Sequence, residues 1–482
     1  MRTSLFLWLL PSNFFLKVVY TVLLVEFRGG GRCGRAICLD LSSFIPILQN
    51  INSQNTNLMK LTSTHRAGNA LHHSIFTRYF AIATTLFSLT TATACGQAPA
   101  QNSAESTAEI APKPIPEGAI RFDYKNHLYF DAVIRDTLPV RLVFDTGNTN
   151  LLLDSTFYAE NFATQGTLRR AFIGGAGNSR EIAWLDISKW TYKVGDHDFT
   201  GPQAVVVNLR KILGNNVDGL FGMEFMRGRK VEFNYADEYI RFLSSEEQPD
   251  NSYTCIDCKW LDDSKTRILL PATLQLDATT SREGLFLVDL GSSGTVTINS
   301  SSVAKMGLQG RSDVSKMTYA VGGIGGSRTD YMFKLADVEL GGLSVKDIRG
   351  DYSGNAAGSL ADKRYDGLIG NLLLERFDVV FDFAECKIYL RPNRNFDKAD
   401  HPFFGVALTP QKDYWTVNGL LEGGNAEKAG MKRGDKIVKI NGKSPCEMSK
   451  EESRALVNSP APWRATIERN GSTIEVEITP ED

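Results

Sequence analysis

Several widespread catalytic motifs are missing from this sequence of 482 residues. It contains no HExxH zinc motif, no GxSxG nucleophile turn and no GxxxxGK[ST] phosphate-binding loop. Histidine is scarce, and beyond residue 100 only His127, His197 and His401 occur, with no motif in common. The sequence therefore offers no metal site, no serine nucleophile and no nucleotide site, and nothing in it calls for a cofactor.

Dense runs of lysine or arginine are missing as well, and the net charge is -2. This charge balance gives no footprint for nucleic acid. Hydrophobic residues make up 42% of the chain, which is enough to bury a core, and the length predicts two to four domains. The 42 glycines favour a fold rich in turns and hairpins.

Cysteine is sparse after the N-terminal region, where Cys255, Cys258, Cys386 and Cys446 remain. Cys255 and Cys258 form a CxxC pair with no second pair or histidine near it, so a zinc site is not expected. A redox pair and a small local disulfide stay open for these two residues. Cys386 lies in an apolar strand pattern and is expected in the core.

The first 95 residues do not read as part of the fold. Residues 1–58 are apolar but interrupted, and we interpret them as an upstream extension; a membrane-inserted N-terminus with two segments is the alternative. Residues 59–95 have a basic start, an apolar stretch and small residues before Cys95, the layout of a signal peptide. The end, ATAC, resembles a lipobox, although Thr91 or Ala92 stands where leucine is usual. The resemblance implies a lipid on Cys95 and an exported, membrane-anchored lipoprotein of a bacterial envelope, in the periplasm or at the outer membrane; plain secretion and a retained membrane anchor are the alternatives.

An internal repeat dominates the rest of the chain. The segment LVFDTGNTNLLLD (142–154) is echoed by FLVDLGSSGTVTI (286–298), and FIGGAGNSR (172–180) by AVGGIGGSR (320–328). The segment 218–242, which begins DGLFG, aligns without a gap to 366–390, which begins DGLIG. Three matched blocks in the same order predict two copies of one β-rich lobe. We expect a flexible linker over 96–117, lobe 1 over 118–243, an interlobe linker over 244–260, lobe 2 over 261–392 and a third domain over 403–482.

Each lobe places an aspartate at the end of an apolar strand, followed two residues later by glycine. These are Asp145-Thr146-Gly147 and Asp289-Leu290-Gly291. Two such loops meeting at a two-fold axis would bring two carboxylates together, and the pair would share one proton. One carboxylate could then activate a water while the other polarises a carbonyl group. The Gly-Gly pairs at Gly174, Gly175, Gly322 and Gly323 suit mobile hairpins over the site, and plain turns are the alternative.

These motifs resemble those of the pepsin and retropepsin type of aspartic peptidase over roughly residues 120–392. DTG is the active-site motif of that family, VGGIGG resembles its glycine-rich flap, and DGLFG and DGLIG resemble its hydrophobic-hydrophobic-glycine element. The resemblance implies a mainly β, two-lobed fold with Asp145 and Asp289 as the catalytic pair. Because one chain supplies both aspartates, we expect a monomer.

One residue departs from the family pattern. Leu290 stands where the family has threonine or serine, whose hydroxyl braces the opposite loop. Thr146 can still serve from its side, but Leu290 cannot reciprocate. We expect Asn148 and Ser292 to hydrogen-bond the outer carboxylate oxygens and compensate in part. Loosely positioned carboxylates would lower the rate of catalysis.

The C-terminal domain resembles the PDZ domains of bacterial envelope proteases. Phe404-Gly405-Val406 matches their carboxylate-binding loop, and residues 429–435 and 440–442 match their AGL-x-x-GD and ING signatures. The resemblance implies a small α+β domain that takes up a C-terminal peptide tail as an added strand. A packing module with an unused groove is the alternative.

The sequence as a whole predicts an aspartic endopeptidase that acts on polypeptide, with a PDZ domain that recruits substrate or regulates cleavage. The alternative is a catalytically decayed peptide-binding or scaffold protein of the envelope.

Overall fold

Short runs of alternating apolar residues form strands through most of the described chain. The computed structural model describes residues 114–162 and 168–481, and all of them belong to one unit, Ile110–Asp482. Strand β3, Leu128–Ile134, shows the principle, because every second side chain is buried. Among the described residues, no helix is long and apolar enough to cross a membrane. The predicted mainly β, two-lobed fold with a following PDZ domain is confirmed.

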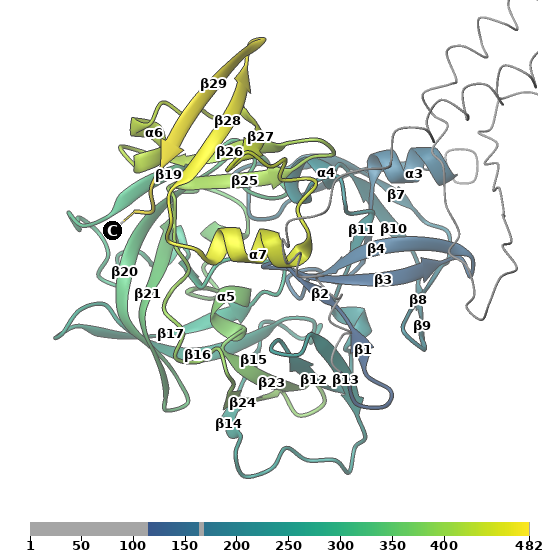
Figure 1. Cartoon of the computed structure of the whole chain (residues 1–482). Helices are drawn as coiled ribbons and strands as arrows, with labels where there is room; N and C mark the ends of the chain where they lie inside the picture. Colours follow the sequence, from purple (N-terminus) through teal and green to yellow (C-terminus); the bar gives the residue numbers. More distant parts are fainter. Residues whose placement is uncertain (1–113, 163–167, 482) are drawn as a thin grey trace, which may run out of the picture. The chain divides into compact units, whose positions relative to one another are not determined.

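Lobe 1 is built on one curved sheet of ten strands (Figure 1). Besides β3, its strands are β2 (Asp123–Tyr124), β4 (Leu138–Phe144), β5 (Leu151–Asp154), β6 (Leu168–Ile173), β7 (Glu181–Asp186), β8 (Trp190–Val194), β9 (His197–Gly201), β10 (Ala204–Val207) and β11 (Gly219–Phe221). Its helical segments are α3 (Ser155–Phe162), α4 (Arg210–Leu213) and the 3-10 turn η2 (Met223–Phe225).

Lobe 2 repeats this plan. Its strands are β15 (Lys259–Trp260), β16 (Ile268–Gln275), β17 (Ser281–Val288), β18 (Val296–Ile298), β19 (Ser315–Tyr319), β20 (Arg328–Leu340), β21 (Leu343–Ser353) and β22 (Gly367–Ile369). The helical segments are η3 (Ser300–Ser302), η4 (Ser359–Ala361) and α5 (Asn371–Leu374). The DGLFG and DGLIG blocks form equivalent elements, because β11 precedes η2 and β22 precedes α5.

A third sheet joins the two lobes. Its order is β1 (Ile120–Arg121), β13 (Tyr239–Leu243), β12 (Lys230–Asn234), β23 (Phe377–Asp382), β24 (Lys387–Pro392) and β14 (Thr254–Asp257). At its centre β12 pairs antiparallel with β23, and Glu232 lies opposite Val380, its own counterpart in the aligned repeat. The two-fold axis between the repeats therefore passes through this pair. The segment expected as a linker contributes a strand of its own, β14.

The PDZ domain has its own apolar core, separate from the core of the lobes. Its elements are β25 (Val406–Pro410), β26 (Trp415–Leu421), α6 (Asn425–Lys428), β27 (Lys436–Ile440), α7 (Lys450–Asn458), β28 (Trp463–Arg469) and β29 (Ser472–Ile478). Helix α7 begins with a capping box between Ser449 and Glu452. The Asn470-Gly471 turn joins β28 to β29, as its sequence predicts.

Candidate active site

Both aspartates of the repeat follow equivalent strands. Asp145 comes directly after β4 and Asp289 directly after β17. Asp145 N donates to Phe221 O at 3.0 Å, and Asp289 N donates to Ile369 O at 2.9 Å. Each aspartate is therefore held by the neighbouring strand of its own lobe, β11 or β22, which runs parallel to the strand that carries it.

The two glycines of the loops allow the carboxyl groups to meet. Gly147 N donates to Asp145 Oδ1 at 2.8 Å, and Gly291 N donates to Asp289 Oδ1 at 3.0 Å. A Cβ built on Gly147 would lie 3.0 Å from Asp289 Oδ1, and one on Gly291 would lie 2.5 Å from Asp145 Oδ1. Any side chain at Gly291 would strike the opposite carboxylate. With this room kept free, Asp145 and Asp289 hydrogen-bond each other through their carboxyl groups.

The electrostatics of the pair favour one retained proton. Burial raises the pKa of Asp145 well above its usual value, and the charge of Asp289 raises it further. Burial also raises the pKa of Asp289, while hydrogen bonds from Gly291 N and from Asp145 oppose that rise. Two carboxyl groups in contact cannot both ionise cheaply, so the pair holds a proton to a higher pH than a free carboxyl group would.

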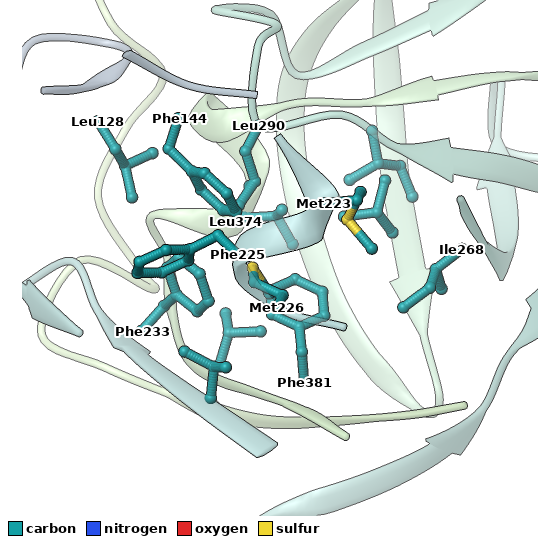
Figure 2. Packing of buried hydrophobic residues seen from close by; sticks show 14 of the residues in the cluster. Leu128, Phe144, Met223, Phe225, Met226, Phe233, Ile268, Leu290, Leu374 and Phe381 are labelled. Atoms are coloured by element: carbon teal, nitrogen blue, oxygen red, sulfur yellow. The ribbon is translucent and has the colours of Figure 1, made fainter. Parts of the chain in front are cut away.

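Only one side of the pair has a hydroxyl brace. Thr146 is buried, and its Oγ1 donates to Val288 O at 2.7 Å and accepts from Leu290 N at 2.9 Å. Leu290, at the equivalent place, is fully buried in the same apolar cluster as Phe144 and Leu374 (Figure 2). Thr146 therefore reaches across to the second loop, while Leu290 offers only apolar packing in return.

The prediction that Asn148 and Ser292 hydrogen-bond the carboxylates is wrong. Asn148 Nδ2 donates to Asn150 O at 2.5 Å, and Ser292 Oγ accepts from Gly294 N at 3.3 Å. In the part of the chain that the structure describes, neither side chain reaches Asp145 or Asp289. Each instead shapes its own turn, because a short polar side chain satisfies the backbone two residues away more readily than a group across the loop.

Asn371 braces the second loop, and the sequence did not reveal it. This fully buried side chain donates from Nδ2 to Leu290 O at 2.7 Å and to Ser292 O at 3.1 Å. Tyr235, from the other repeat, donates its hydroxyl to Asn371 Oδ1 at 2.9 Å. The counterpart of Asn371 in lobe 1 is Met223, so a polar residue facing methionine in the aligned repeats was the available signal.

His127 and Arg267 also flank the pair at equivalent positions. Tyr129 pairs with Val143, so His127, two residues earlier, lies opposite Asp145. Leu269 likewise pairs with Leu287, so Arg267 lies opposite Asp289. His127 Nε2 lies 3.1 Å from Gly291 O, and burial lowers the pKa of His127 to about 4, so its ring is neutral near pH 7. The charge of Arg267 lowers the pKa of both aspartates.

The predicted flap glycines lie at the tips of two hairpins that meet. Gly174 and Gly175 follow β6, and Gly322 and Gly323 follow β19. Between the tips, Gly177 N donates to Ile324 O at 2.9 Å, Asn178 N to Ser327 O at 3.1 Å and Ser179 N to Gly325 O at 3.0 Å.

Each tip also packs against the opposite lobe. Ile324 packs on the cluster that contains Val143, while Ala176 packs on the cluster that contains Leu287. Val143 lies two positions before Asp145, and Leu287 two positions before Asp289. The tips therefore cross near the strands that carry the pair.

One strand of the lobe 2 flap hairpin, β19, also belongs to the PDZ sheet. Strand β19 pairs antiparallel with β26, with Met317 opposite Leu421 and Tyr319 opposite Gly419. Beyond the strand, Val321 N donates to Asn418 Oδ1 at 2.9 Å, and Asn418 Nδ2 donates to Val321 O at 2.6 Å. The flap of lobe 2 is thus held by the PDZ domain, whereas the flap of lobe 1 carries no such strand.

The predicted PDZ loop lies beside the end of the described chain. Phe404 is buried and stacks on Trp463 at 4.1 Å between ring centroids, and Val406 pairs with Leu420. Gly405 has a φ of +68° and lies against the carboxylate of Glu481. Glu481 Oε1 in turn accepts from Asn425 N at 2.6 Å. A side-chain carboxylate of the protein itself therefore occupies the surroundings of this loop.

Some of the remaining predicted positions lie outside the described residues, and the others are cysteines within them. Cys95, the signal peptide and residues 96–113 lie outside the described residues. Among the residues described, Cys255, Cys258, Cys386 and Cys446 are free thiols. Cys386 is buried as predicted, but it lies in the turn between β23 and β24 rather than in a strand.

Comparison with protein families supports both assignments. Residues 130–225 match the family model for an aspartyl protease, and residues 416–468 match the model for a PDZ domain. The first match includes Asp145 but ends before Asp289, so the second aspartate is assigned from the repeat and from its position in the structure. A comparison with curated proteins finds no match.

Proposed function

We propose, from the aspartyl protease and PDZ domains that this chain contains, that it is an aspartic endopeptidase with Asp145 and Asp289 as its catalytic pair. The observation that carries the proposal is the close approach of the two carboxyl groups where the repeats meet: a Cβ on Gly147 would lie 3.0 Å from Asp289 Oδ1 and 3.1 Å from Asp145 Oδ1. This arrangement holds one proton and one negative charge within reach of the same small molecule.

The hydrolysis needs no covalent intermediate. A water between the carboxyl groups gives a proton to Asp289 as its oxygen attacks the peptide carbonyl carbon, and Asp145, which holds the shared proton, passes it to the carbonyl oxygen. The resulting tetrahedral diol collapses as one hydroxyl returns a proton to Asp145, the C–N bond breaks, and the leaving nitrogen takes the proton that Asp289 holds, which restores the pair. Burial raises the pKa of both carboxyl groups, so the proton belongs to the pair, and Asp145 is taken as the acid of that pair.

The two flap tips suggest the class of substrate. A flexible, extended polypeptide can pass beneath two hairpins that separate and close again, while a folded domain cannot. We therefore expect cleavage in unstructured segments or peptides.

The catalytic role is tested with Asp145→Asn and Asp289→Asn on a diverse peptide library. Either change should lower cleavage by at least about 10³-fold, because an amide can neither share the proton nor accept one from water. Asp198→Asn, at an exposed position in lobe 1, is the matched control and should cleave normally. No cleavage by the unchanged protein at any pH, with peptides still bound, would favour the alternative of a decayed peptide-binding protein.

The pH dependence follows from the direction of the pKa shift at Asp145. Because that pKa is raised, the pair keeps its proton as the pH climbs beyond the ordinary carboxyl range. Cleavage should therefore persist above pH 4 and fall as the pH rises through the raised pKa, which the descending limb of a kcat profile measures. A profile that rises toward alkaline pH would contradict the assignment.

For the PDZ domain we favour regulation over recruitment of substrate. The supporting observation is that β26 binds β19, the strand that leads into the flap of lobe 2. Deleting residues 403–482 should raise cleavage of short peptides if the domain restrains the flap. If the deletion instead spares short peptides and impairs a substrate with a matching C-terminal tail, the domain recruits.

We further propose that the chain is exported and anchored in a bacterial envelope through Cys95. The support is the signal-like segment and its lipobox-like end. Cys95→Ser should release the protein from the membrane fraction. If the variant stays bound, the anchor lies in the apolar segment upstream.

A further inference from the structure

The flap hairpin of lobe 1 has an exposed apolar face. Phe172 of β6 pairs with Ile182 of β7, and Arg170 pairs with Trp184, so these side chains share one face of the hairpin. Phe172 is 58% exposed, Ile182 48% and Trp184 42%, and Leu168 at the start of β6 is 37% exposed. Of the six large hydrophobic residues exposed in the described chain, five lie between residues 168 and 187. Such clustering indicates a contact surface rather than chance exposure.

The opposite face of the same hairpin accounts for its stability. Ala183 is fully buried, and Ile173 and Leu185 pack on the apolar cluster of Val143 and Leu220. The hairpin is therefore anchored without Phe172, Ile182 or Trp184. Among the described residues, no packing contact of the fold depends on these three exposed side chains.

The charge around this face has one sign. Arg170 lies on this face opposite Trp184. The other exposed basic residues of the hairpin and its flanks are Arg180, Lys189 and Arg169, which lies opposite Leu185 on the other face. The carboxylates of the same segment are occupied, because Glu181 pairs with Lys211, and Asp186 is buried and accepts from the hydroxyl of Tyr158 at 2.8 Å. The face is thus cationic on a chain whose net charge is -2.

We propose that this face docks on an anionic lipid surface. Aromatic and aliphatic side chains beside arginines are what binding in the headgroup region requires, with the rings at the acyl boundary and the charges at the phosphates. The guanidinium of Arg170 lies 5.1 Å from the ring of Phe172, so charge and ring can enter together. The described fold begins at residue 114, and the 18 residues 96–113 separate it from Cys95, a reach of about 65 Å.

Docking would place one flap of the proposed active site at the bilayer. The proposed active site would then act on polypeptide that lies at, or emerges from, the membrane. This goes beyond the proposed peptidase activity and draws support from the proposed anchor at Cys95.

The test is quenching of Trp184 by brominated lipid. The full chain is bound to vesicles of phosphatidylglycerol or of phosphatidylcholine, each with brominated acyl chains, and emission is compared with that of Trp184→Phe. Quenching that depends on Trp184 should be strong with phosphatidylglycerol and at least about fivefold weaker with phosphatidylcholine, from the loss of basic-residue attraction. An equal fractional loss of emission in the two proteins between unbrominated and brominated vesicles of either lipid, with both proteins bound, would overturn the proposal.

Two sets of variants separate docking from folding and catalysis. Phe172→Ser with Ile182→Ser should abolish the Trp184 quenching, and Arg169→Gln with Arg170→Gln should reduce it on phosphatidylglycerol alone. Val457→Ser, at an exposed apolar residue of α7, is the control and should change nothing. The quenching should be the same in the Asp145→Asn background, so failure of the peptidase proposal would appear separately. If the serine variants keep the quenching but abolish a dimer in sedimentation, the face binds a second copy and the proposal is wrong.

Discussion

At the level of single residues, the two halves of the proposed catalytic pair are braced by different chemistry. Thr146 supplies a hydroxyl from lobe 1, while Leu290 in lobe 2 supplies only packing. Asn371 donates hydrogen bonds to the carbonyl groups of Leu290 and Ser292. The loss of one hydroxyl is therefore offset by a buried amide that lobe 1 lacks, since its counterpart is Met223.

This asymmetry predicts the effect of restoring the hydroxyl. Leu290→Thr should raise kcat for short peptides several-fold by tightening the second loop, and should lower the unfolding free energy by about 1–3 kcal/mol through lost apolar burial. Peptide kinetics and thermal unfolding measure the two effects. Leu290→Val is the matched control, because it has the branched shape without the hydroxyl and should lose stability with no gain in kcat. A gain in both variants would attribute the effect to packing.

A buried carboxyl group near the flap of lobe 2 should govern stability against pH. Asp351 pairs with Met332 across β20 and β21, and burial together with the charge of Asp330 raises its pKa to about 7. Between pH 4 and pH 7 the unfolded chain releases this proton while the folded chain keeps it, so stability falls as the pH rises through that window.

Replacing Asp351 by asparagine should remove that dependence. Asp351→Asn should gain thermal stability over the unchanged protein at pH 8 but not at pH 4, by up to roughly 4 kcal/mol at about 1.4 kcal/mol per pKa unit. Melting curves at pH 4, 6 and 8 measure it. Asp347→Asn, exposed on the same strand, should shift no curve; a shift of equal size at all three pH values would exclude titration as the cause.

The sequence predicted those site residues that occur at the same position in both repeats. Asp145, Asp289, Gly147 and Gly291 recur at matched positions, and the structure brings them together. The bracing residue Asn371 occurs once and acts on loops far away in the sequence, so no local pattern could reveal it. Asn148 and Ser292 were assigned to the carboxylates because they are near in sequence, and turn geometry directed them elsewhere.

At the level of strands and hairpins, periodicity predicted the local elements but not their partners. The matched DGLFG and DGLIG blocks form equivalent elements, and the Asn-Gly pair at 470–471 forms a hairpin, as an Asn-Gly between two alternating segments predicts. The pairing of β14 with β24 and of β19 with β26 depends on which edges are left open once the lobes assemble. Edge pairing of that kind is decided by tertiary structure, so the linker strand and the shared sheet appear only in the structure.

The crossing of the two flap tips depends on one glycine in particular. A Cβ on Gly177 would overlap the backbone of Gly325, and Gly177 N donates to Ile324 O. Gly177→Ala should separate the tips, increase amide hydrogen exchange at residues 174–180 and 320–327, and raise KM for peptides by about tenfold, since a lid that closes poorly holds substrate poorly. Gly174→Ala is the control in the same tip, because its Cβ would have nothing nearer than 3.9 Å. Unchanged exchange in Gly177→Ala would show that the tips do not need this contact.

At the level of the whole molecule, the PDZ domain breaks the two-fold relation between the lobes. The repeats are equivalent at β12 and β23, at the aspartate loops and at the flap tips. In the part of the chain that the structure describes, only the flap of lobe 2 pairs with a strand of another domain, β19 with β26. On the far side β26 pairs with β25, which follows the Phe404-Gly405-Val406 loop, so one strand lies between that loop and the flap. Strand β25 also contacts lobe 1, where Asn215 N donates to Pro410 O at 3.3 Å. A ligand that shifts β25 would therefore act on the flap of lobe 2 through β26 and on lobe 1 through this contact.

Asn418 offers the sharpest test of this link, because its side chain exchanges two hydrogen bonds with Val321 of the flap. Asn418→Ala removes both without touching the PDZ core, and at about 1 kcal/mol per bond it should free the flap of lobe 2 by an order of magnitude or more in its opening equilibrium. We expect higher kcat/KM for short peptides and faster hydrogen exchange at residues 320–327, with exchange at 174–180 rising less. Thr416→Ala, on the same strand but opposite Lys436 of β27, should leave both measurements unchanged. If Asn418→Ala loosens the flap yet leaves kcat/KM for short peptides as it was, opening is not limiting, and the shared strand fixes the position of the domain without restraining catalysis.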